Sequence, residues 1–189
     1  MASYTVILDA CVMYPAPLRS YLMYLANTGL FRARWTEQIH DEWTRNLLKN
    51  RPELNAEQLQ RTRQLMNANV PDCLIEGYES FIDGLTLPDV DDKHVVAAAI
   101  KGQAESIITF NLKDFPSCEL DPLGLSAIHP DEFLCDMFEL DSSACVKAAQ
   151  QQRASLKRPP MSQDEFLACL QKQRLPSFIS HLKSFKLML

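Results

Sequence analysis

Several carboxylates and one amide stand where the chain is expected to leave a strand, and side chains of these types can bind a metal ion. Asp9 directly follows the apolar run YTVIL at residues 4–8. Asn111 and Asp114 follow a second such run, SIITF, at residues 106–110. Parallel strands end at one edge of a sheet, and open α/β folds bind their ligands at that edge. The sequence therefore places these three side chains at one rim.

Further carboxylates are expected to reach the same rim from helices. Asp89, Asp91 and Asp92 precede or cap a helix that leads into the second strand, and Glu42 lies in mid-helix on the side of Ile39. Carboxylates held together are costly unless they are protonated or neutralised by a cation. Oxygen ligands without a His or Cys companion favour Mg²⁺ or Mn²⁺ over zinc. We therefore expect a divalent-cation site.

Each acidic residue also has an ordinary structural explanation. Asp9 fits a turn at the end of a strand, and Asp92 fits a helix N-cap. Glu42 fits a solvated helix face, while Asp89 and Asp91 fit charges in a loop. The metal hypothesis therefore depends on the set of residues and not on any single member.

Other chemistries lack the residues that they need. A calcium loop starting at Asp89 requires Gly at its sixth position and Glu at its twelfth, where the chain has His94 and Ile100. Cys11 stands where an aspartyl-phosphate phosphatase would have its second Asp, and no glycine-rich phosphate loop occurs. The six cysteines show no zinc-binding spacing, so we expect reduced thiols. His94 is expected on a helix surface.

The elements that position these residues alternate between strand and helix. Besides the two strands named above, the pattern predicts a short strand at 31–35. Helices are predicted to follow Pro15, the N-cap Thr36, the capping box of Asn55 and Gln58, and Asp92. This alternation indicates an α/β domain with a central, mainly parallel sheet.

The composition changes after Ser126. Three helical stretches are predicted, at 130–139, 142–154 and 162–172. We interpret them as a helical C-terminal appendage rather than a second independent domain. The expected division is the α/β domain at 1–128 and an extension at 129–189.

Composition and charge restrict the class of protein. The chain has 189 residues, 47% of them hydrophobic, and a net charge of −5. No apolar run approaches the roughly 20 residues that span a bilayer. Residues 1–4 do not resemble the start of a signal peptide, so a cytoplasmic protein is predicted. Acidic residues dominate 72–121 and basic residues dominate from Lys147 onward, which fits either solvated surface or a cation site beside an anionic partner.

Three blocks of this sequence resemble the PIN-domain ribonucleases. They are ILDACV at 7–12, LPDVDDKHVVAAA at 87–99 and IITFNLKDF at 107–115. Their order and spacing agree with that family over roughly residues 4–128. Within it, the chain resembles the VapC-type toxin branch, including longer members with a helical C-terminal extension.

The resemblance implies a PIN-like three-layer α/β domain whose acidic cluster binds one or two Mg²⁺ or Mn²⁺ ions. Asp9 and Asp92 are then the main ligands, and Glu42 or Asp114 positions the attacking water. The implied site residues are Asp9, Glu42, Asp92 and Asp114, with Asn111 and Asp89 as candidate outer ligands.

The activity that the resemblance implies is hydrolysis of RNA phosphodiesters, as an endoribonuclease toxin of a type II toxin–antitoxin pair. In-line attack would expel the 3′-oxygen and leave a 5′-phosphate. The implied partners are RNA, a cognate antitoxin protein and a second copy in a homodimer, with no membrane. A non-catalytic PIN-like binding scaffold and a housekeeping RNA-processing or DNA-acting nuclease of the same fold remain alternatives.

An acidic protein that binds RNA needs basic side chains for the phosphates. For any single one of them, a solubilising side chain is the ordinary explanation. The candidates are Arg32, Arg34, Arg45, Lys49, Lys157 and Arg158, together with Lys172, Arg174, Lys183 and Lys186.

Overall fold

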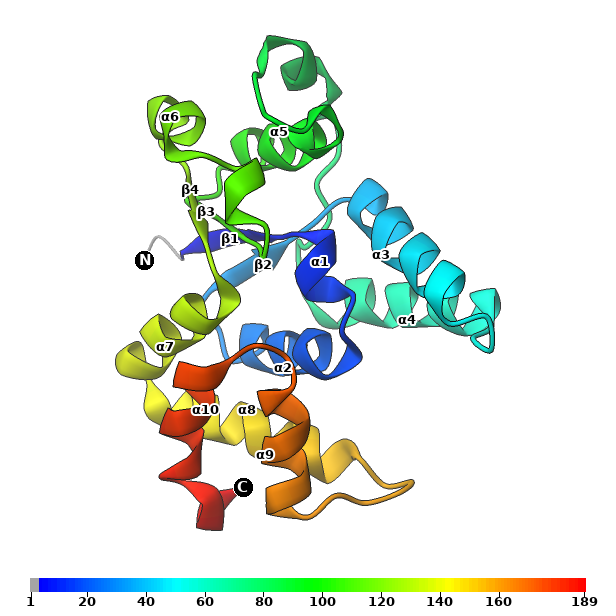
Figure 1. Cartoon of the computed structure of the whole chain (residues 1–189), viewed down its shortest axis with the longest axis vertical. Helices are drawn as coiled ribbons and strands as arrows, with labels where there is room; N and C mark the ends of the chain where they lie inside the picture. Colours follow the sequence, from blue (N-terminus) through cyan, green and yellow to red (C-terminus); the bar gives the residue numbers. More distant parts are fainter. Residues whose placement is uncertain (1–3) are drawn as a thin grey trace.

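The computed structural model describes residues 4–189, and its centre is a four-stranded parallel sheet (Figure 1). The strands are β1 (Thr5–Leu8), β2 (Arg32–Arg34), β3 (Ser106–Ile108) and β4 (Ser126–Ile128), in the order β2-β1-β3-β4. The predicted α/β fold with a parallel sheet is confirmed, whereas β4 was not predicted. The absence of a signal peptide was predicted from residues 1–4, of which 1–3 lie outside the described range.

The order of the strands creates a crevice at the carboxyl end of the sheet. From β1 the chain crosses to β2 on one side and then returns to β3 on the other side. Ile7 of β1 is in register with Arg34 of β2 and with Ile107 of β3. A reversal of this kind between two neighbouring strands is where doubly wound sheets bind ligands. The fold thus indicates a ligand site at the carboxyl ends of β1 and β3.

Helices on both sides of the sheet complete three layers, with α5 and α6 on one side and α2 and α7 on the other (Figure 1). The first helices begin largely as the sequence predicts. Thr36 Oγ1 accepts from the N–H of Ile39, and the Asn55 side chain accepts from the N–H of Glu57. These helices are α1 (Ala10–Met13), α2 (Ala16–Ala26), α3 (Glu37–Asn50) and α4 (Ala56–Asn69).

Two expectations about the middle of the chain are wrong. Asp92 occupies the N-cap position of α5, but its side chain makes no capping hydrogen bond, because the preceding turn is helical and is capped by Asp89. His94 is only 3% exposed and not on a helix surface, because α5 is buried from His94 to Ala99. The elements here are η1 (Glu79–Gly84), η2 (Val90–Asp92), α5 (Lys93–Lys101), η3 (Leu112–Asp114), α6 (Ser117–Leu120) and η4 (Asp121–Leu123).

The C-terminal helices, α7 to α10, lie together on the α2 side of the sheet (Figure 1). Three of them were predicted, but α10 was not. Its first N–H groups, those of Ser177 and Phe178, donate to the carboxylate of Asp131 in α7, which is distant in sequence. The elements are α7 (Pro130–Leu140), α8 (Ser142–Ser155), α9 (Gln163–Gln171), α10 (Pro176–Lys183) and η5 (Lys186–Met188).

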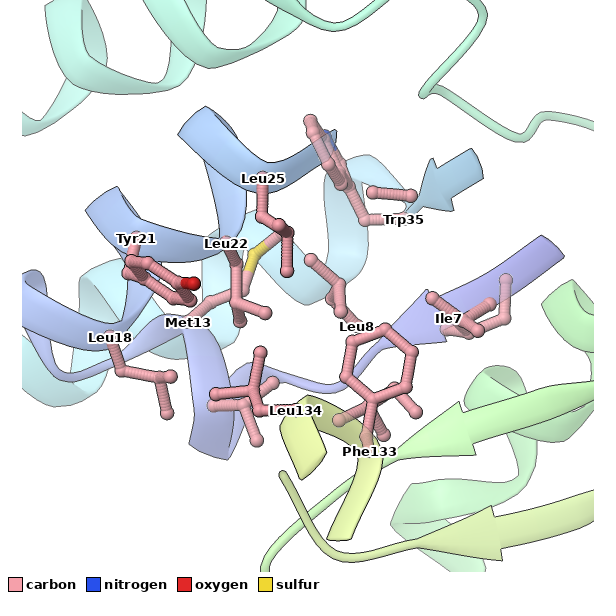
Figure 2. Packing of buried hydrophobic residues seen from close by; sticks show 14 of the residues in the cluster. Ile7, Leu8, Met13, Leu18, Tyr21, Leu22, Leu25, Trp35, Phe133 and Leu134 are labelled. Atoms are coloured by element: carbon pink, nitrogen blue, oxygen red, sulfur yellow. The ribbon is translucent and has the colours of Figure 1, made fainter. Parts of the chain in front are cut away.

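One continuous hydrophobic core joins the sheet to these helices. Figure 2 shows Phe133 and Leu134 of α7 packed close to Leu8 of β1. The ring of Phe133 meets that of Phe31 edge-on, with 5.0 Å between centroids. Tyr21 of α2 donates through its hydroxyl to a backbone carbonyl of α8. The division at residue 128 stays a prediction.

Within residues 4–189, no helix is long and apolar enough to cross a membrane. All six cysteines are free thiols.

Candidate functional site

Asp9 is the residue that follows β1, and three hydrogen bonds fix its carboxylate. Oδ1 accepts from the N–H of Ala10 at 2.6 Å, and Oδ2 accepts from Thr109 Oγ1 at 2.7 Å and from Cys11 Sγ at 3.0 Å. Asp9 is 5% exposed. Burial raises the pKa of this carboxyl above its ordinary value, although the three hydrogen bonds oppose the shift. Asp9 is therefore held in one orientation at the end of the sheet.

Thr109 and Cys11 are site residues to which the sequence reasoning gave no role. Thr109 also accepts from the N–H of Asn111 at 3.0 Å, and Cys11 Sγ accepts from the N–H of Phe110 at 3.2 Å. Because Leu8 and Ile108 are in register, the next residues, Asp9 and Thr109, lie side by side. Asp9 and Thr109 are each the first residue after their strand, and this shared position in the sequence could have predicted that they are neighbours.

Glu42 reaches the site from α3 and contacts His94 of α5. Glu42 Oε1 lies 2.7 Å from His94 Nε2, and the two side chains are 21% and 2% exposed. Glu42 is thus turned inward, on the side of its helix that also carries the buried Ile39. The contact places the carboxylate of Glu42 beside α5.

Asp92 has a strongly perturbed carboxyl. It is half-buried, and its pKa is raised to about 7. Burial is the largest cause, followed by the negative charges of Asp9, Asp89, Asp114 and Glu42. These five carboxylates therefore share one electrostatic environment, and clustered perturbed groups of this kind are typical of functional sites.

A cavity of about 550 Å³ brings most of these residues together. Asp9, Glu42, Asp92 and Asn111 line it, and we call it the acidic pocket. Asp89 and Asp114 do not line it, although their charges act on Asp92. A neighbouring cavity shares Glu42 and Asp92 and is also lined by Asp41, Arg45, Asp91 and His94.

The acidic pocket suits a divalent cation in its donor chemistry but is not a preformed cage. Within residues 4–189, no group of three or more His, Cys, Asp or Glu side chains is arranged to hold a metal ion. Glu42 is turned toward His94, and Asp9 toward Thr109 and Cys11. The mutual repulsion on Asp92 and the oxygen donors nonetheless fit a hard cation such as Mg²⁺ or Mn²⁺. The roles of the four carboxylates as ligands stay a prediction.

Most of the basic residues predicted to bind RNA are dispersed, whereas Lys172 and Arg174 line the acidic pocket. Arg32 lies 3.8 Å from Asp72, and Arg34 donates to the carbonyls of Asp72 and Gly102. Arg32 is in register with Thr5 at the start of β1, away from the end that carries Asp9. Arg45 borders the neighbouring cavity, whereas Lys49, Lys157 and Arg158 line neither cavity. Their contact with RNA stays a prediction.

A parallel sheet with carboxylates gathered at the crevice between β1 and β3 defines an α/β protein with an acidic ligand pocket. The chain belongs to the PIN domain family, which matches residues 5–113, and the VapC50 C-terminal domain matches residues 130–184. The resemblance to VapC-type PIN proteins with a C-terminal extension is thereby confirmed.

One curated relative from Mycobacterium tuberculosis carries the name "Putative ribonuclease VapC50". It is 38% identical over 87 residues, which are 46% of this chain and 51% of the relative. The chain thus spans about half the length of the curated relative that it matches.

Proposed function

We propose that this protein is a divalent-metal-dependent endoribonuclease and the toxin of a type II toxin–antitoxin pair. One observation supports this most directly: Asp9, Glu42 and Asp92, from three distant parts of the chain, line one pocket. Membership of the PIN domain family and the name of the mycobacterial relative agree with a ribonuclease. A scaffold without catalysis would gain nothing from the repulsion that acts on Asp92.

The proposed reaction is the attack of water on a phosphodiester of RNA. A divalent cation at the carboxylates, when bound, supplies activation of water near neutral pH and neutralises charge on the phosphate. Asp9 and Asp92 would hold this ion, and Glu42, which contacts His94, or Asp114 would position the attacking water. The water oxygen bonds to phosphorus as the bond to the 3′-oxygen breaks. The products are a 5′-phosphate and a 3′-hydroxyl.

The proposed partner is an antitoxin whose basic side chain reaches into the acidic pocket. Excess negative charge at Asp92 would attract such a side chain, as it attracts a cation. A homodimer and a cytoplasmic location belong to the same proposal and are based on the sequence and the family.

Cleavage of total cellular RNA by the purified protein tests the proposal. The protein, free of any partner, is incubated with Mg²⁺ or Mn²⁺ and, separately, with EDTA. Discrete fragments with 5′-phosphates should form only with the metal, and not with Asp9→Asn. Asp83→Asn is the matched control, because Asp83 is exposed and lines neither the acidic pocket nor the neighbouring cavity.

Two results would redirect the proposal. No cleavage by the folded, metal-loaded wild type would favour a binding scaffold. Cleavage without any growth arrest on expression would favour a housekeeping nuclease of the same fold over a toxin.

A further inference from the structure

A turn between two C-terminal helices forms part of the wall of the acidic pocket. This α9–α10 turn, residues 172–175, contributes Lys172, Gln173 and Arg174 to the same cavity that Asp9 and Asp92 line. In Figure 1 the connection from α9 to α10 (orange to red) lies at the end of these helices that faces α1. The pocket therefore has a negative and a positive part.

The two basic residues of this turn do not neutralise the carboxylates. The ion pairs formed within residues 4–189 include neither Lys172 nor Arg174. The Arg174 guanidinium instead lies over the ring of Phe110, 4.9 Å from its centroid. Phe110 directly follows Thr109, which donates to Asp9. Arg174 therefore packs against the segment that supports Asp9. The positive charge is thus held close to the carboxylates but apart from them.

The position of the Arg174 guanidinium over the ring leaves its N–H groups able to donate hydrogen bonds elsewhere. A guanidinium that stacks on a ring uses its face, while its N–H donors point outward in the plane. Arg174 is exposed and lines the acidic pocket. A planar fork of donors matches two oxygens of a phosphate group.

The fold fixes the turn that presents this side chain. Arg174 has a φ of 62°, in the left-handed region that non-glycine residues rarely adopt. Directly beyond it, Leu175 is fully buried, and Asp131 accepts hydrogen bonds from the N–H groups of Ser177 and Phe178. A strained residue persists only where its surroundings over-determine it, and such residues cluster at functional sites.

We propose that Arg174, with Lys172 beside it, binds a phosphate of the RNA substrate next to the carboxylate-bound ion. The proposal deepens the proposed ribonuclease function and rests on it. The C-terminal helices then supply part of the active site itself and not only packing for the sheet. A divalent cation on the acidic side and a guanidinium on the other would hold one phosphate between them.

The test compares Arg174→Asn with Arg174→Lys. Asn removes the charge but tolerates the left-handed backbone, so the turn can keep its shape. Lys147→Gln is the matched control, because Lys147 is an exposed cation of α8 that lines neither cavity. The single-turnover rate of RNA cleavage should fall about 10²-fold in Arg174→Asn, as for loss of a donor to a charged transition state. It should fall less in Arg174→Lys and stay within about twofold in Lys147→Gln.

Two binding measurements separate a phosphate contact from other roles. Calorimetric Mn²⁺ affinity should be unchanged in Arg174→Asn, since Arg174 pairs with no carboxylate. For single-stranded RNA bound to the Asp9→Asn protein, adding Arg174→Asn should reduce the slope of log K against log salt by about 0.7. Lys147→Gln should leave that slope unchanged.

The outcomes distinguish this inference from the proposed function. Cleavage by wild type and Arg174→Asn at equal rates would overturn the inference and leave the ribonuclease standing. Faster cleavage or tighter Mn²⁺ binding in Arg174→Asn would overturn it in favour of an inhibitory turn. If wild type cleaves nothing, the ribonuclease proposal fails. The salt slope then decides whether Arg174 contacts phosphate, and an unchanged slope overturns the contact.

Discussion

Thr109 donates a hydrogen bond of 2.7 Å to the carboxylate of Asp9, which lies 100 residues earlier in the chain. The two residues directly follow the two central strands, β3 and β1. The same hydroxyl accepts from the backbone N–H of Asn111. This one side chain therefore orients the first acidic residue of the pocket and also fixes the loop beyond β3.

Replacing Thr109 by Val should weaken binding of Mn²⁺ while the protein stays folded. Loss of the donor removes one of the three hydrogen bonds that lower the pKa of the Asp9 carboxyl, and residues that orient ligands typically contribute about 10-fold or more to metal affinity. Thr109→Ser keeps the hydroxyl and should bind Mn²⁺ nearly as wild type does. Titration calorimetry measures the Mn²⁺ affinity of both variants. Equal Mn²⁺ affinities of Thr109→Val and wild type would refute a positioning role for Thr109.

Replacing Asp92 by Asn should stabilise the protein in the absence of metal. The pKa of Asp92 is about 7 in the folded protein and about 4 in an unfolded chain, so ionisation opposes folding. The free energy of unfolding in EDTA should therefore decrease as the pH rises from about 4 to about 7. Thermal unfolding at several pH values should show a flatter dependence in Asp92→Asn.

The control for this measurement is Asp83→Asn, which should keep the wild-type pH dependence. Added Mn²⁺ should raise the stability of wild type, by about 2.7 kcal/mol at 100 times the dissociation constant, and that of Asp92→Asn by less. An Asp92→Asn protein less stable than wild type at pH 8 in EDTA would contradict the repulsion argument.

Replacing Asp131 by Ala should destabilise the protein by about 2 kcal/mol, because two N–H groups at the start of α10 lose a charged acceptor. For a chain of this size, the expected decrease in Tm is about 4–8 °C. Asp136→Ala, an exposed acidic residue of the same helix, should change Tm little. Differential scanning calorimetry would show the difference, and equal Tm values for the two variants would exclude this cap as a stabilising feature.

Replacing Phe133 by Ala should cost about 3–5 kcal/mol and leave a single unfolding transition. Phe133 is fully buried and meets Phe31 next to the sheet, so the C-terminal helices should unfold with the sheet. Calorimetry and circular dichroism should report the same midpoint. Two separate transitions would show instead that residues 129–189 fold as a domain of their own.

The parts of the fold that depend on local pattern were predictable. A buried parallel strand is a short apolar run, which is why β1 and β3 could be located. Thr36 and Asn55 cap helices through residues two or three positions away, so their role is encoded locally. The short strand β4 is only partly buried and has no such apolar run.

Features that depend on distant contacts could not be predicted in this way. His94 is buried because other parts of the chain surround α5 from His94 to Ala99. From the sequence alone, a titratable residue is ordinarily expected to be exposed to solvent. The start of α10 is capped by Asp131 and so lacks a local capping residue. In the candidate site, the sequence pattern pointed to Asp9, Glu42 and Asp92 but not to the support from Thr109.

The separation in sequence between the parts of the acidic pocket also has a consequence for biosynthesis. Translation delivers β1 and its neighbour β2 early, yet β3, on the other side of β1, emerges about 100 residues after β1, so the first strand must wait for its second partner. The carboxylates are all synthesised before the turn that carries Arg174. A nascent chain thus acquires its acidic residues early but completes the pocket only after α9 has left the ribosome.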